Sequence, residues 1–127
     1  MSIDYSDAGE SGFKIDNPNE PPRVKQLSVQ ELAQMRERGE AFELIDVRTE
    51  QEHGTASIEG ARLLDDAGRG ELLRLDKDTP LVFLCHHGQR SQAAAETFLQ
   101  QGFTRVFNVR GGIDAWSREV DSSVPRY

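Results

Sequence analysis

The chain contains one cysteine, few aromatic residues and no long apolar run. Its 127 residues include nine aromatic side chains other than histidine and a single thiol, Cys85. One thiol excludes an internal disulfide and any metal site built from several thiolates. No stretch approaches the roughly 20 apolar residues of a membrane span, and the N-terminus lacks the basic and apolar segments of a secretory signal. We therefore expect a cytoplasmic protein that does not enter a membrane.

Acidic residues outnumber basic ones. There are 22 Asp and Glu against 15 Lys and Arg, which gives a net charge of −7. This charge repels phosphate backbones, so we expect no nucleic-acid partner. Residues 1–22 contain five acidic residues, one lysine and little to bury, which predicts a disordered acidic N-terminal tail. The remaining residues, 23–127, are long enough for one domain.

Hydrophobic patterning within residues 23–127 predicts alternating strands and helices. Ser28 and Glu31 fit a capping box that opens a helix, and Gly39 ends it. Short apolar runs over residues 42–47, 81–84 and 105–109 are typical of buried strands, and residues 91–101 suit a helix that ends at Gly102. Residues 61–64 could form a short strand and residues 71–75 a turn or two of helix. A helix between two such strands implies parallel pairing, so the predicted fold class is α/β.

The cysteine lies where such a fold binds its ligands. Ligands of open parallel sheets bind at the carboxyl ends of the strands, and Cys85 directly follows the strand over residues 81–84. The backbone N–H groups of the turn and of the next helix favour an anion there, which lowers the pKa of a thiol. Gly88 is the residue of the turn that can adopt a positive φ without strain. The alternative is an inert buried thiol, the commoner fate of a cysteine after an apolar strand.

Four segments resemble the rhodanese-like sulfurtransferases. The loop from Cys85 to Arg90 and Ser91 is similar to the active loop of that family, and residues 44–48 (LIDVR) resemble its Asp-Val-Arg strand end. Residues 58–61 (IEGA) and 108–116 (NVRGGIDAW) resemble its Ile-x-Gly-Ala and Gly-Gly-x-x-Ala-Trp segments. The resemblance implies a central five-stranded parallel sheet flanked by helices. It also implies that the cysteine accepts a sulfane sulfur from a donor such as thiosulfate and passes it, as a persulfide, to cyanide, a thiol or a protein thiol.

The candidate site consists of the loop and its neighbours. Cys85 is the predicted nucleophile, and Arg90 is expected to close the anion site electrostatically. The backbone N–H groups that surround the sulfur are expected to come from His86, His87, Gly88, Gln89 and Ser91. Asp46 and Arg48 are expected to support this loop from the neighbouring strand, the alternative being an ion pair on the surface.

The three histidines are given minor roles. His86 stands where many relatives have arginine, so a dianionic donor should bind less tightly, and activity on thiosulfate should fall as His86 deprotonates. Adjacent histidines rarely bind one ion together, and the sequence offers no further ligand cluster, so we expect no metal in the site and no cofactor. His53 lies in a polar stretch and is expected to be solvated.

Two alternative functions remain open. The first is a sulfur-relay or binding module that carries persulfide only when a partner protein delivers it. The second is a phosphatase or arsenate reductase on the same scaffold. Phosphatases that resemble this family place five residues between cysteine and arginine, whereas this chain has four. The shorter loop suits a sulfur atom better than a phosphoryl group.

Overall fold

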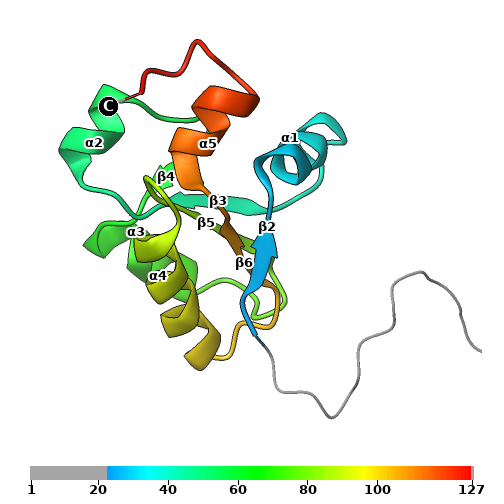
Figure 1. The fold of residues 1–127 in the computed structure, drawn as a ribbon. Helices are drawn as coiled ribbons and strands as arrows, with labels where there is room; N and C mark the ends of the chain where they lie inside the picture. The colour runs from blue at the N-terminus through cyan, green and yellow to red at the C-terminus, as the bar shows by residue number, and fades with distance from the viewer. Residues whose placement is uncertain (1–22, 127) are drawn as a thin grey trace, which may run out of the picture.

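The computed structural model describes residues 23–126 and contains one sheet of five parallel strands. The strands lie in the order β2-β6-β5-β3-β4 (Figure 1). Their bounds are Lys25–Leu27 for β2, Glu43–Asp46 for β3, Arg62–Leu63 for β4, Leu81–Leu84 for β5 and Val106–Val109 for β6. The predicted α/β class and the five-stranded parallel sheet are confirmed.

Helices cover both faces of the sheet. Helices α1 (Val29–Glu37) and α5 (Gly112–Glu119) pack on one face, and α3 (Asp66–Leu73) and α4 (Gln89–Gln100) on the other (Figure 1). A short helix, α2 (Glu50–Thr55), follows β3. All four side chains of β5 are buried because the strand is central and covered on both sides. Val82 and Leu84 join the core under α1 and α5, whereas Leu81 and Phe83 join the core under α3 and α4.

Most of the predicted elements are present with small shifts at their ends. The strand over residues 81–84 is confirmed, and the capping box of α1 is formed, with the Ser28 side chain accepting from the Glu31 N–H at 3.1 Å. Helix α3 begins at Asp66, five residues before the predicted helical turn. Its first turns contain Gly68 and Gly70, which weaken the helical pattern in the sequence.

Three elements were not predicted. Strand β2 has three residues, of which two are polar and exposed, so it carries no apolar run. Helix α2 has no buried side chain, although Thr49 and Glu52 form a capping box that marks its start. Helix α5 begins at Gly112, after its N-cap Gly111, where the sequence pattern predicted no helix.

Two further expectations concern the N-terminal tail and membrane-spanning helices. The predicted disordered tail over residues 1–22 lies outside the residues described. Among the helices between residues 23 and 126, none is long and apolar enough to cross a membrane.

The connections that leave the sheet at its carboxyl edge define where a ligand can bind. The chain leaves β5 for α4 on one face and leaves β6, the neighbouring strand, for α5 on the other face. Such a divergence opens a crevice outside the strand ends. The turn that contains the cysteine lies at this edge.

Candidate active site

The Cys85 loop, residues 85–91, connects β5 to α4 and buries its sulfur among donors. Cys85 is 1% exposed. The backbone N–H of Gly88 donates to Sγ at 3.0 Å, and the hydroxyl of Ser91 lies 3.3 Å from Sγ. The thiol is therefore buried, but it lies among polar hydrogen-bond donors and differs from an inert cysteine packed only in hydrocarbon.

The turn that directs these donors at the sulfur depends on Gly88. This residue has φ +106° and is the N-cap of α4, where no side chain accepts a capping hydrogen bond. The Ser91 N–H, three positions into the helix, donates to the thiol of Cys85 instead. The sulfur thus occupies the place of a capping acceptor, at the end of the helix where backbone dipoles stabilise an anion. The prediction that Gly88 adopts a positive φ is confirmed.

Hydrogen bonds lower the pKa of the thiol. Burial acts to raise the pKa of Cys85, but hydrogen bonds from the Ser91 hydroxyl and from the N–H groups of Ser91, Gly88 and His87 outweigh it. The pKa of Cys85 therefore lies below its ordinary value. The charge of Arg90 is not among these five largest influences.

Asn108 on β6 holds the serine that contacts the sulfur. The Ser91 hydroxyl makes a short hydrogen bond to Asn108 Oδ1, and both side chains are buried. Asn108 Nδ2 donates to the carbonyl of Gly88 at 3.1 Å and to Gln26 Oε1 at 3.0 Å, which fixes the orientation of the amide. A hydroxyl carries one proton, so Ser91 donates either to Asn108 or to Cys85 Sγ at any moment. Ionisation of the thiol favours donation from the Ser91 hydroxyl to Cys85 Sγ.

Helix α5 packs directly against the backbone of the Cys85 loop. The N–H of Ile113 donates to the carbonyl of Cys85 at 2.8 Å, and the N–H of Asp114 donates to the carbonyl of His86 at 3.1 Å. A Cβ atom at Gly112 would overlap both of these carbonyl oxygens. The first turn of α5 therefore satisfies its free N–H groups on the loop and holds the loop in place.

Asp46 and Arg48 form a buried ion pair beside the loop. Arg48 Nη2 lies 2.6 Å from Asp46 Oδ2, and Nε donates to Oδ1 at 2.9 Å, with both side chains fully buried. The alternative of a surface ion pair is therefore wrong. His53 Nδ1 lies 2.7 Å from Asp46 Oδ2, and the His53 side chain is 29% exposed. The expectation that His53 is solvated is also wrong, because α2 carries it over the aspartate.

Arg48 connects this ion pair to the loop through α2. Its guanidinium donates to the carbonyl of Ala56, the C-cap of the short helix, at 2.5 Å and to that of Glu52, within the helix, at 3.4 Å. The side chain of Glu52 then reaches Arg90 across the site. Arg90 Nη1 and Nη2 donate to Glu52 Oε1 and Oε2 at 2.8 and 3.0 Å. Arg90 is thus paired with Glu52, and the expectation that its charge closes the sulfur site stays a prediction.

The outer side chains of the loop come together with a residue of α5. The rings of His86 and His87 stack with centroids 4.0 Å apart, and Asp114 lies beside them. Burial and the neighbouring charge of His87 lower the pKa of His86. His86 therefore loses its proton at a lower pH than an ordinary histidine, which moves the predicted pH dependence of thiosulfate use to more acidic conditions. The sequence had offered no third ligand near the two histidines, and the structure adds Asp114.

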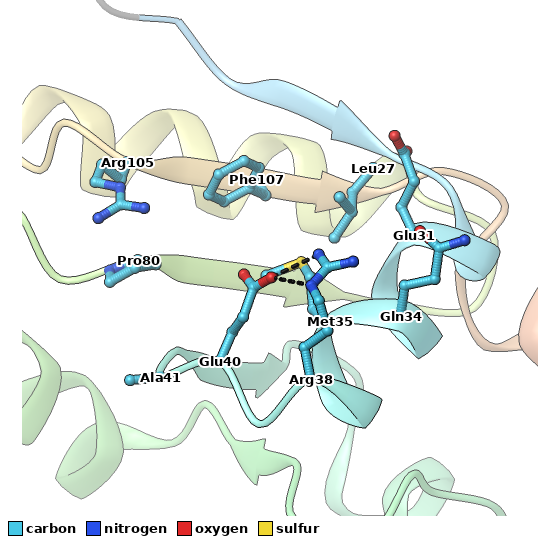
Figure 2. A pocket seen from close by; sticks show the side chains of 10 residues that line it. All are labelled: Leu27, Glu31, Gln34, Met35, Arg38, Glu40, Ala41, Pro80, Arg105 and Phe107. Atoms are coloured by element: carbon cyan, nitrogen blue, oxygen red, sulfur yellow. Dashed lines mark hydrogen bonds and ion pairs between the residues drawn. The ribbon is translucent and has the colours of Figure 1, made fainter. Parts of the chain in front are cut away.

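A separate pocket of about 270 Å³ lies away from the cysteine (Figure 2). Its lining includes Met35 and Arg38 of α1 and Phe107 of β6, together with Pro80 and Arg105, which precede β5 and β6. Cys85 does not line it. Because Pro80 and Arg105 mark the amino ends of these strands, the pocket reaches the edge opposite the Cys85 loop.

Sequence reasoning located the loop but missed the residues around it. Asn108, Glu52 and Asp114 contact the loop from three other elements. The capping-box spacing from Thr49 to Glu52 was the one signal that could have placed Glu52 at the start of a helix after β3.

A family model and named relatives both place the chain in one family. The model of the rhodanese-like domain matches residues 28–119. The thiosulfate sulfurtransferase GlpE of Pseudomonas aeruginosa is 34% identical over 93 residues, which are 72% of this chain and 83% of that protein. GlpE of Shewanella oneidensis is 37% identical over 93 residues, covering 72% of this chain and 91% of that protein.

A solved structure agrees with these sequences. The crystal structure of a rhodanese-like domain protein from Staphylococcus aureus matches with a TM-score of 0.66 and 27% identity, over 82% of this chain and 99% of that one. The matched region contains the whole Cys85 loop and the segments that hold it. The chain belongs to the rhodanese-like domain family and is a rhodanese-type sulfurtransferase.

Proposed function

We propose that the chain transfers a sulfane sulfur from a small donor such as thiosulfate to a thiophilic acceptor through a persulfide on Cys85. The observation that carries the proposal is the set of donors around Sγ: the Gly88 N–H at 3.0 Å, the Ser91 hydroxyl at 3.3 Å and the N–H groups of Ser91 and His87. Fixed dipoles of this kind stabilise an anionic sulfur without the reorganisation that water needs.

The two half-reactions use the same sulfur atom. The thiolate of Cys85 attacks the outer sulfur of thiosulfate, a new S–S bond forms, the donor S–S bond breaks, and sulfite leaves with the electron pair. Cyanide or a thiolate then attacks the terminal sulfur of the persulfide. Sγ takes back the electron pair, and thiocyanate or a new persulfide leaves. Because Cys85 is 1% exposed, the sulfur has to become more accessible when the donor binds.

The supporting residues have positioning roles in this proposal. Gly88 and Ser91 direct donors at the sulfur, and Asn108 orients Ser91. Asp46 and Arg48 hold α2, from which Glu52 reaches Arg90. His86, His87 and Gln89 form the outer part of the loop, so their side chains face the donor as it enters.

The test measures turnover and the covalent intermediate separately. Thiosulfate and cyanide should give thiocyanate with the wild-type chain, and Cys85→Ser should give none. Intact-mass analysis after thiosulfate alone should show one added sulfur on the wild-type chain, absent from Cys85→Ser and removed by cyanide. The chain has no second thiol to accept the sulfur, so the assignment is unambiguous.

Other outcomes would replace the proposal. Added sulfur that appears only after incubation with a persulfidated protein would indicate a relay module that depends on a partner. Hydrolysis of a phosphate ester without thiocyanate formation would indicate the phosphatase alternative. If the wild-type chain gains no sulfur on Cys85 and forms no thiocyanate, the persulfide mechanism is contradicted.

A further inference from the structure

Three potential metal ligands meet where the Cys85 loop contacts α5. His86, His87 and Asp114 each offer one ligand atom, and these atoms all lie within 4.8 Å of one another. Within residues 23–126, this is the one group of three such side chains. His86 and Asp114 are half-buried and His87 is exposed, so an ion could reach the group from solvent.

The backbone holds the three residues together. The N–H of Asp114 donates to the carbonyl of His86 at 3.1 Å, and the adjacent Ile113 N–H donates to the carbonyl of Cys85 at 2.8 Å. Gly112 allows this close approach, because any side chain there would overlap the loop carbonyls. The approach of Asp114 to the histidines is therefore built into the fold and does not depend on the conformation of long side chains.

Hydrogen bonds favour the ionised form of Asp114, which metal binding needs. Metal binding requires a neutral imidazole and an ionised carboxylate. Hydrogen bonds from Arg126 and Arg118 keep the pKa of Asp114 below its usual range.

The arginines beside Asp114 leave room for an ion. Arg118 Nε donates to Oδ2 and Arg126 Nε donates to Oδ1, both at 3.0 Å. Each carboxylate oxygen has two lone pairs, so one remains on each. Hydrogen bonds of this kind commonly orient ligating carboxylates.

We propose that His86, His87 and Asp114 bind a divalent transition-metal ion such as Zn²⁺, with water completing the coordination. Two histidines and one carboxylate are a donor set that Zn²⁺ uses in sites that keep an open position. Two nitrogens bound to one zinc lie at most about 4.2 Å apart. The three ligand atoms lie within 4.8 Å of one another, and the exposed His87 ring has to turn so that its nitrogen faces the ion.

Metal binding can be tested without sulfur transfer. Isothermal titration of Zn²⁺ into full-length Cys85→Ser excludes the thiolate as a ligand. We expect one ion per chain. His87→Gln in the same background should weaken binding by at least about tenfold. His53→Gln is the matched control, since His53 is the only other histidine and lies outside the group. It should leave the affinity unchanged.

A second measurement needs no histidine substitution, so it remains valid if His87→Gln fails to fold. In NMR spectra of Cys85→Ser, Zn²⁺ should shift the ring nitrogens of His86 and His87 and leave those of His53 in place. Absence of saturable binding would overturn the proposal. Binding that His87→Gln does not weaken, or ring shifts confined to His53, would also overturn it, because either would place the ion elsewhere.

Discussion

Replacing Ser91 with alanine should raise the pKa of Cys85 and leave the fold in place. The hydroxyl is the largest of the influences that lower the pKa of the thiol, and its proton is shared between Sγ and Asn108 Oδ1. A hydrogen bond to a charged group contributes about 1.5 to 3 kcal/mol. Since this proton has two acceptors, we expect the lower end of that range. A loss of about 1.4 kcal/mol corresponds to a tenfold change, so the thiolate population below the pKa should fall about tenfold.

The assay is a titration of the thiolate absorbance, with Cys85→Ser as the blank. Because the chain has one thiol, the difference signal reports Cys85 alone. The midpoint should move to higher pH in Ser91→Ala. Sulfur transfer from thiosulfate at neutral pH should decrease in the same variant, since a smaller fraction of the protein carries the nucleophile.

Ser117→Ala is the matched control for Ser91→Ala. Ser117 is also buried, and its hydroxyl donates to the carbonyl of Val124, away from the Cys85 loop. It should lower the free energy of unfolding without moving the thiolate titration. A midpoint that stays unchanged in Ser91→Ala, or that moves equally in Ser117→Ala, would refute the argument that this hydroxyl stabilises the thiolate.

Three other substitutions test the surroundings of the loop. Asp46→Asn removes the carboxylate charge that faces the buried Arg48 and should lower the free energy of unfolding by about 3 kcal/mol in denaturant titrations near neutral pH. Burial acts to raise the pKa of Asp46, but hydrogen bonds from Arg48 outweigh it, so the folded-state pKa lies below the ordinary value. The stabilisation should therefore be present above about pH 4 and be lost as the pH falls through the lowered folded-state pKa. Gly112→Ala should destabilise the chain and abolish sulfur transfer, because the new Cβ overlaps the loop carbonyls at a φ of +61°. Glu52→Gln keeps the capping box but removes the negative charge that faces Arg90, so the KM for the thiosulfate dianion should fall.

Each substitution has a control of the same type. Glu40→Gln breaks an exposed ion pair with Arg38 and should lower the free energy of unfolding by at most about 1 kcal/mol. An equal loss from Asp46→Asn would contradict the argument that the Asp46–Arg48 pair is buried. Gly70→Ala has open space around the new Cβ and should be tolerated; equal damage at this position would remove the steric argument for Gly112. Glu50→Gln makes the same charge change on α2, and an equal fall in KM would mean that net charge alone matters.

The parts of the site that were predictable are local in the chain. A strand, a thiol, a glycine and a helix start lie within about ten residues, so the placement of Cys85, Gly88 and Ser91 needs no knowledge of the rest of the fold. The capping box of Ser28 and Glu31 is local in the same sense. The central strand was predicted with the correct ends because both of its faces are apolar.

The parts that were not predictable depend on how distant elements pack. Asn108 reaches Ser91 only because β6 pairs with β5 in one register, with Asn108 opposite Phe83. Asp114 reaches His86 only because α5 starts directly under the loop. His53 was misjudged for the same reason, since its polar neighbours in the sequence gave no sign of the buried aspartate that it contacts.

The pairing of Arg90 with Glu52 follows from helix geometry and bears on the chemistry. Consecutive residues of a helix project about 100° apart, so Ser91 and Arg90 cannot both face the sulfur. Ser91 is fully buried against Sγ, which turns Arg90 outward to Glu52. The hydrogen bonds that lower the pKa of Cys85 therefore come from neutral groups, and Arg90 is paired with a carboxylate. A site of this kind keeps one anionic sulfur ionised without concentrating positive charge for a dianion. Its selectivity among sulfur donors should then depend on the Glu52–Arg90 pair more than on the sulfur loop itself.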